Sequence, residues 1–213
     1  MALSDSLEIM TMDWDAIPSD EVIKSTAEAL QKRGFQVVIV TNRGEALEKL
    51  KELIPAGASV MTGGSTTLDE VGFTKYLISG KHPYRNLKDA ILAEKDPQKQ
   101  GELRRQSILA DYFLGSVQAI AQTGEVVSCD ATGTRTSPYA YGPRRVLWVS
   151  GANKIVKDLE QGLRRMREHC VPLEDQRMKK IGYPGTTLSR ILIYEHSDPN
   201  RITLVLVKEK LGF

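Results

Sequence analysis

Hydrophobic and polar positions in the first third of the chain follow helical and strand periods in turn. The segment Pro18-Ser19-Asp20-Glu21 has the capping hydroxyl and the first-turn acids of a helix start. The helix that follows is predicted to end at Gly34. Its apolar positions predict a face made of Val22, Ala29 and Leu30.

Strand and helix signals then repeat along the chain. The β-branched run 35–40 predicts a strand, and Asn42 caps a second helix that ends before Pro55. The apolar run 58–61 predicts another strand, which leads through a small-residue loop into a short helix at 66–72. Helix, strand, helix, strand, helix is the order of right-handed parallel crossovers, so we expect an α/β fold.

The middle of the chain combines charged helix with hairpin and loop signals. Residues 86–110 have a helical and strongly charged pattern, which is typical of a solvated helix face. Residues 119–122 and 125–128 flank Thr123-Gly124 at the spacing of a tight hairpin. Segment 131–143 is rich in Gly, Pro, Ser and Thr and predicts a long loop of the kind that often carries function.

The last third returns to strands and a helix. A strand is expected at 145–149, then a loop at 151–153 and a long basic helix over 154–169. Two strands, 191–195 and 202–207, end the chain on either side of a Pro-containing turn.

No repeat or linker divides the chain, so we predict one α/β domain over residues 18–213 with a mixed, mostly parallel sheet flanked by helices. Residues 1–17 are acidic and weakly patterned, which favours a short helix or an arm. No apolar run is long enough to span a membrane, and the start of the chain lacks the basic residues of a signal peptide. We therefore expect a cytoplasmic protein without membrane contact.

The charge balance and the cysteine content limit the classes of function that the chain can have. Lys and Arg number 29 against 27 Asp and Glu, a net charge of +2, so no basic field favours nucleic-acid binding. The 2 cysteines, Cys129 and Cys170, form neither a four-cysteine set nor a CxxC pair, and we expect reduced thiols. His82, His169 and His196 show no metal-ligand spacing. We expect no iron–sulfur cluster in this chain, so any redox centre belongs to another component or to a soluble cofactor, whose identity stays open.

Small and hydroxyl side chains between a predicted strand and helix form a first candidate site. Backbone N–H groups of such a loop can approach a phosphate or carboxylate, and a helix start favours negative charge. The loop lacks the lysine of a P-loop and the GxGxxG spacing, and a glycine turn with a hydroxyl cap is the alternative interpretation. The candidate binding residues are Thr62, Gly63, Gly64, Ser65 and Thr66.

A second candidate site combines an acid, hydroxyls, a glycine and an arginine within residues 130–135. Arg135 can hold a carboxylate or phosphate bidentately; alternatively, Asp130 and Thr132 organise the turn and Arg135 is solvated. Crevices form at strand ends in open α/β sheets, which favours the functional interpretation. The candidate binding residues are Thr132, Gly133, Thr134 and Arg135, and Asp130 is a candidate catalytic acid.

Two further positions are weaker candidates. Asn153 and Lys154 follow a predicted strand, as the first loop does; the alternative interpretations are a helix cap for Asn153 and a surface charge for Lys154. Glu125 follows the hairpin glycine and is a candidate nucleophile or general base, or alternatively an exposed strand acid.

Taken in order, four stretches of the chain resemble the LUD (lactate-utilisation) domain family, once catalogued as a domain of unknown function. They are KRGFQVVIVTNRGEALEKLKELIPAGASVMTGGSTTLDEVGF, ADYFLGSVQAIAQTGEVVSCDATGTR, YGPRRVLWVSGANKIVKDLEQGLRRMRE and ITLVLVKEKLGF. The resemblance implies the fold of the sugar-phosphate isomerase and CoA-transferase superfamily (NagB/RpiA/CoA transferase-like), with the ligand site in loops at strand ends. By that similarity, the site is lined by Gly63, Gly64, Ser65 and Thr66 and faced by Glu125, Asp130, Gly133 and Arg135.

The resemblance also implies a role in lactate or related organic-acid metabolism, the oxidation of lactate to pyruvate, beside a partner iron–sulfur redox protein. The chain is similar to the small, cluster-free member of such systems. It departs from many relatives at Gln118 and Thr134, where they carry Asn, and at KIGYPGTTLSR, where they carry a cysteine-containing segment.

Two alternatives to the lactate role stay open. One is a stand-alone isomerase or acyl/CoA transferase that acts on a phosphorylated or thioester substrate through Glu125 or Asp130. The other is a module that binds a small anionic metabolite without turnover. Whether the chain is itself an enzyme, and whether it forms a homo-oligomer, is left open.

Overall fold

The computed structural model describes residues 12–213, which fold around two β-sheets. The larger sheet has six strands in the order β1-β10-β7-β4-β2-β3, and each of its pairs is parallel. Its strands are β1 (Gln36–Val40), β10 (Ile202–Val207), β7 (Arg145–Gly151), β4 (Tyr112–Gly115), β2 (Ser59–Thr62) and β3 (Arg85–Asn86). The predicted single α/β domain with a mostly parallel sheet is confirmed.

The smaller sheet has four strands in the order β8-β5-β6-β9 and contains the antiparallel pairs, β5 with β6 and β6 with β9. Its strands are β8 (Ile155–Val156), β5 (Ala119–Ala121), β6 (Val126–Asp130) and β9 (Arg190–Tyr194). The hairpin predicted around Thr123-Gly124 joins β5 to β6, and Gly124 has the positive φ of 99° that this turn requires. The two strands at the end of the chain belong to different sheets.

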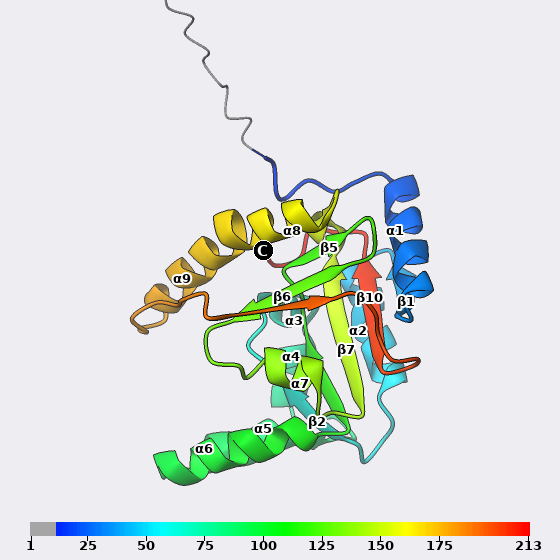
Figure 1. Cartoon of the computed structure of the whole chain (residues 1–213). Coiled ribbons are helices and arrows are strands. Elements are labelled where there is room, and N and C mark those ends of the chain that lie inside the picture. The colour runs from blue at the N-terminus through cyan, green and yellow to red at the C-terminus, as the bar shows by residue number, and fades with distance from the viewer. Residues whose placement is uncertain (1–11) are drawn as a thin grey trace, which may run out of the picture.

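Helices cover both sheets (Figure 1). They are α1 (Asp20–Lys32), α2 (Arg43–Leu53), α3 (Thr66–Val71), α4 (Phe73–Ile78), α5 (Leu87–Ala93), α6 (Pro97–Gln106), α7 (Thr136–Ala140), α8 (Leu159–Arg165) and α9 (Val171–Lys180). The 3₁₀ turns η1 (Ser107–Leu109) and η2 (Ala152–Lys154) follow α6 and β7, and the π-helical segment η3 (Met166–Cys170) joins α8 to α9.

The large sheet is buried on both faces, which explains its continuous apolar strands. Along β7, Leu147 and Val149 face a core that also contains side chains of α2, α3 and α4, whereas Val146 and Trp148 face the opposite core. That second core contains side chains of α1 and of the small sheet. The outer face of the small sheet packs against the segment around Met166, and α8 lies over it in Figure 1. The result is a layered domain in which the small sheet lies between the large sheet and α8.

The structure corrects the predicted apolar face of the first helix. Ile23, Thr26, Ala27 and Leu30 are the buried residues of α1, so Leu30 was placed correctly. They follow the spacing i, i+3, i+4, i+7 that keeps one helix face toward the core. Val22 and Ala29 lie at the edge of that face and are half-buried.

The structure also corrects the helix predicted from Lys154. Residues Ile155–Val156 pair with β5 as strand β8, and the helix begins only at Leu159, where the Asp158 side chain caps it by accepting the N–H of Gln161 at 2.9 Å. The β-branched pair before an acidic cap explains the late start. The predicted long loop at 131–143 contains the short helix α7.

Most of the predicted arm, residues 1–11, lies outside the described residues. Within residues 12–213, no helix is both long and apolar enough to cross a membrane.

Candidate functional site

A cavity of about 290 Å³ lies where loops from both sheets meet. The loop after β2, the loop after β4, the end of β6 and the turn after β7 all contribute to its walls. The candidate residues among those lining it are Gly63, Gly64, Ser65, Thr66, Asp130, Thr132, Thr134, Arg135 and Lys154. The structure therefore brings together the two candidate loops and Lys154, which are far apart in the sequence.

Lys154 is the most buried charged group of this cavity, with 2% of its surface exposed. It ends the η2 turn, and its amine lies 3.0 Å from Thr67 Oγ1 and 3.0 Å from Ser116 Oγ. In residues 12–213 no carboxylate lies within ion-pair distance of this amine. Burial, together with the nearby charges of Arg165 and Arg135, lowers the pKa of Lys154 from 10.5 to about 7. The alternative interpretation of Lys154 as a surface charge is wrong.

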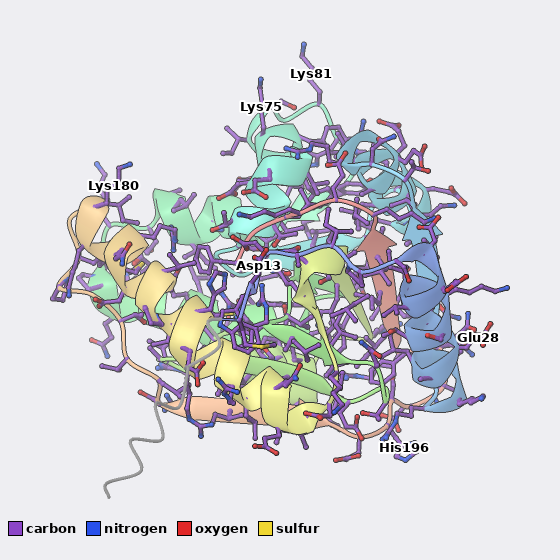
Figure 2. All side chains as sticks on the ribbon, turned by 90° about the horizontal axis from the view of Figure 1, so that it is seen from above. Asp13, Glu28, Lys75, Lys81, Lys180 and His196 are labelled. Carbon is purple, nitrogen blue, oxygen red and sulfur yellow. The ribbon has the colours of Figure 1, made fainter. Side chains whose placement is uncertain are left out.

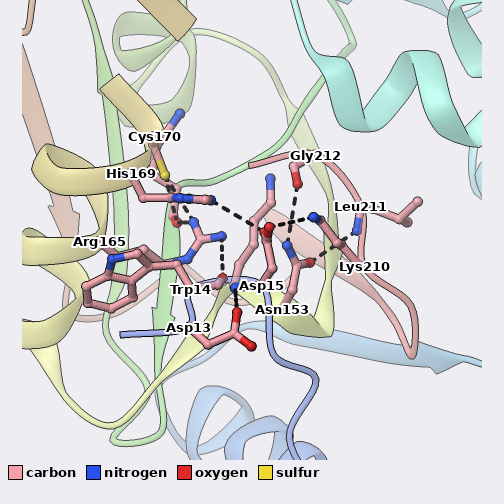
Figure 3. A network of polar contacts seen from close by, with 12 residues as sticks. Asp13, Trp14, Asp15, Asn153, Arg165, His169, Cys170, Lys210, Leu211 and Gly212 are labelled. Carbon is pink, nitrogen blue, oxygen red and sulfur yellow. Dashed lines mark hydrogen bonds and ion pairs between the residues drawn. The ribbon is translucent and has the colours of Figure 1, made fainter. Parts of the chain in front are cut away.

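Close backbone packing holds the Lys154 turn in place. A Cβ atom at Gly151 would lie 2.4 Å from Asn153 Oδ1 and 2.5 Å from the Leu211 nitrogen, so only glycine fits there. The Asn153 side chain accepts the Leu211 N–H at 3.1 Å and donates to the Gly212 carbonyl at 3.4 Å (Figure 3). Asn153, predicted to bind ligand, is absent from the cavity wall and instead ties the turn to residues 211–212.

Asp130 organises its own loop. Its carboxylate accepts the N–H groups of Gly133 at 2.6 Å, Arg135 at 2.9 Å and Thr136 at 2.8 Å, and the Thr136 hydroxyl at 3.2 Å. Burial by itself raises the pKa of Asp130, but these hydrogen bonds outweigh it and hold the pKa below its ordinary value. The carboxylate is thus ionised and engaged by the backbone, as in the turn-organising alternative.

Arg135 bridges the two candidate loops. Its guanidinium donates to the Gly64 carbonyl at 2.7 Å and to the Cys129 carbonyl at 3.3 Å. Arg135 is half-buried, so it is only partly solvated. Both contacts are to neutral carbonyls, so its charge is available to an anion in the cavity.

Besides Asn153, three predicted site residues lie off the cavity wall. Glu125 pairs with Arg33 at 2.5 Å and accepts the Thr123 hydroxyl, so the structure does not bring it to the other candidates. Thr62 is buried and accepts from Lys88 Nζ at 3.3 Å. Gly133 forms the turn of its loop at a φ of 90°.

Several cavity residues carried no sequence signal. Ser116, Cys129 and Cys170 line the cavity, and so do Glu174 and Arg177 of α9, which pair with each other at 2.7 Å. Helix α9 was not predicted, so nothing placed its side chains near the glycine loop. Burial raises the pKa of the Cys129 thiol to about 12 and raises that of Cys170 as well, so both thiols are protonated near neutral pH.

A polar network behind the cavity joins distant segments (Figure 3). Arg165, fully buried, donates to the Trp14 carbonyl at 3.2 Å and to Cys170 Sγ at 3.0 Å. Asp15 pairs with Lys210 at 2.5 Å and lies 3.4 Å from His169. The network fixes residues 14–15 against the helix that carries Arg165.

No metal centre is evident in the part of the chain that the structure describes, where no group of three or more His, Cys, Asp or Glu side chains could hold an ion. His196 is exposed at the rim of the molecule (Figure 2), and His82 contacts the Leu77 carbonyl at 3.0 Å. The histidines lie in separate parts of the fold.

Comparison with known proteins gives a family model and a similar structure. The family model described as the LUD domain matches residues 23–207. A crystal structure of a DUF162 family protein from Deinococcus radiodurans is similar, with a TM-score of 0.53 and 13% sequence identity. The similarity covers 90% of this chain and 99% of that one, and at this identity it shows the fold alone. No curated protein matches.

Proposed function

Because the chain belongs to the LUD domain family, we propose that it binds a small carboxylate metabolite, of the class of lactate and pyruvate, in the cavity beside Lys154 and Arg135. The protein acts in cytoplasmic organic-acid utilisation. A partner iron–sulfur redox protein carries the electrons of lactate oxidation.

The observation that carries this proposal is the buried amine of Lys154, whose hydrogen-bond partners are hydroxyls. A buried charge is costly unless an opposite charge accompanies it, and here the described residues place none within ion-pair distance. An anion in the cavity would supply that charge. Arg135, held between neutral carbonyls, adds a second positive charge in the same wall.

The size of the cavity supports a small ligand. At about 290 Å³ it lies at the lower end of ligand cavities, which span about 300–1,000 Å³. A three-carbon acid needs little of that volume, whereas a complete coenzyme would need more. Two carboxylates were predicted to serve an acyl or CoA transferase. Glu125 is engaged with Arg33 away from the cavity, and Asp130, in the cavity wall, accepts three N–H groups of its own loop, which weighs against that alternative.

The cysteine count supports the proposed partner. The chain has 2 cysteines, and four thiolates are needed to ligate a common iron–sulfur cluster. Oxidation of lactate to pyruvate releases two electrons, and in this proposal the partner protein accepts them.

Thermal unfolding of the purified protein with lactate, pyruvate, acetate and inorganic phosphate tests the binding proposal. At a hundredfold excess over the dissociation constant, lactate and pyruvate should each stabilise the fold by about 2.7 kcal/mol. The stabilisation should vanish in Lys154→Met and persist in Lys180→Met, since Lys180 is exposed at the end of α9 (Figure 2). Absence of saturable binding by any carboxylate would overturn the proposal.

The metabolic role needs a separate test. Deletion of the gene should slow growth on lactate and leave growth on glucose unchanged. Normal growth on lactate would contradict the role while leaving the binding result intact.

A further inference from the structure

The amine of Lys154 has the surroundings of a nucleophile. It forms part of the cavity wall, and Thr67 Oγ1 and Ser116 Oγ each lie 3.0 Å from it. A hydroxyl can accept a hydrogen bond from the ammonium or donate one to the lone pair of the neutral amine, so both protonation states are satisfied. The amine therefore need not stay charged to stay hydrogen-bonded.

We propose that Lys154 forms a reversible imine with a 2-oxo acid bound in this cavity. The inference rests on the proposed function, because it takes the same ligand class and the same cavity. It adds a covalent step and selects, among carboxylates, those with a carbonyl next to the acid group.

The charges around the amine favour its reactive form. After burial, the positive charge of Arg165 disfavours the ammonium most; Cys170 favours it, Arg135 disfavours it and Glu70 favours it, each by less than the one before. Burial dominates, and the resulting pKa of Lys154, about 7, leaves about half of the amine neutral at pH 7. An ordinary exposed lysine has on the order of a thousandfold less neutral amine at that pH. Desolvation beside other cations is a known way to activate a lysine.

The position of Arg135 allows both ends of a 2-oxo acid to be held at once. Its guanidinium forms part of the cavity wall and can retain the carboxylate after Lys154 has lost its proton. A 2-oxo acid held in this way would have its carbonyl carbon within the same cavity as the amine. Thr67 and Ser116 are positioned to pass protons between the amine and the carbonyl oxygen.

The step is balanced without an oxidant or a reductant. The Nζ lone pair attacks the carbonyl carbon, and the oxygen takes up a proton from the nitrogen to give a carbinolamine. A second proton moves from nitrogen to that hydroxyl group, which leaves as water while the C=N bond forms. One water molecule is released for each imine, and hydrolysis reverses the reaction.

Borohydride trapping tests the inference with pyruvate as the probe. The intact wild-type protein is incubated with pyruvate, reduced and digested, and the peptides are analysed by mass spectrometry. We expect one main adduct, on Lys154, with the added mass of pyruvic acid less one oxygen atom. Lactate has a hydroxyl in place of the carbonyl, so it should give no adduct under the same conditions.

Two variants and a parallel binding measurement complete the design. Lys154→Arg keeps the charge but should lose the adduct, whereas Lys180→Met should keep it. If neither lactate nor pyruvate binds, the proposed function fails and the imine fails with it. If both bind but reduction yields no adduct on Lys154, or labels exposed lysines equally, the imine alone is overturned. Mapping on the wild-type protein makes the result independent of whether a variant folds.

Discussion

Replacing Lys154 by Met should stabilise the protein near neutral pH. Methionine keeps the length and much of the volume of the lysine stem, so the packing changes little. Lowering the pKa of Lys154 from 10.5 to about 7 corresponds to about 5 kcal/mol of destabilisation in the charged form. The Thr67 and Ser116 hydroxyls lose their shared partner, at about 1 kcal/mol each. Below pH 7, the free energy of unfolding of Lys154→Met should therefore exceed that of the wild type by about 3 kcal/mol.

The sign of this effect depends on pH in a definite way. Below pH 7 both the folded and the unfolded chain carry the Lys154 proton, so the wild type bears the full cost of burying the charge. Between about pH 7 and pH 10.5 only the unfolded chain keeps the proton, and the wild type gains about 1.4 kcal/mol of stability per pH unit. The two proteins should therefore be about equally stable near pH 9, and the variant should be the weaker one above that.

Urea unfolding of both proteins at several values between pH 6.5 and about pH 10 measures the difference directly. Titrations common to both proteins cancel in that difference. Lys180→Met is the matched control, because this exposed side chain should change the free energy of unfolding by less than about 0.5 kcal/mol at every pH. A variant that is less stable at pH 6.5, or a difference that does not change with pH, would refute the reasoning.

Three further substitutions, with Gly101→Ala as a control for the first, test contacts in and away from the cavity. Gly151→Ala should lower the free energy of unfolding in urea by about 3 kcal/mol, because its new Cβ would lie 2.4 Å from the Asn153 side-chain oxygen. A Cβ at Gly101, inside helix α6, would have nothing within 4 Å, so Gly101→Ala should raise that free energy by up to about 1 kcal/mol. Asp130→Asn should lower the free energy of unfolding by about 2 kcal/mol at pH 7. Since the fold lowers the pKa of Asp130, this difference should shrink as the pH falls below about 4. A difference that stays constant with pH would contradict an ionised Asp130 that organises its loop. Glu125→Gln should lose about 1.5 kcal/mol of stability with its Arg33 partner but leave the dissociation constant for pyruvate unchanged in calorimetric titration.

The sequence by itself determined the local elements. The Ser19 and Asn42 side chains cap the helices they were predicted to begin, and the hairpin turn falls at Gly124. Caps, turns and apolar periods depend on residues within a few positions of each other, so a single chain shows them without its fold. The order of these elements, with the family resemblance, was sufficient to predict the α/β class.

Sequence patterns gave wrong or missing elements where contacts with distant segments decide the local structure. The segment after Lys154 was predicted as helix, but residues 155–156 pair with β5, which only the fold brings alongside. Helix α9 has a mostly polar sequence and no buried residue, so no apolar period predicted a helix there. Nothing local to this segment indicated that it lines the cavity.

Tertiary structure alone decided the chemistry of the cavity. Thr67, Ser116 and Lys154 follow different strands of the large sheet, and parallel strands separated by crossovers bring their carboxyl ends to one edge. The low pKa of Lys154 depends on the water that surrounding segments exclude and on charges far away along the chain. Glu125 and Lys154 were both weak candidates from the sequence. In the fold, Glu125 pairs with Arg33 and Lys154 faces the cavity, because burial and proximity are properties of the packed chain.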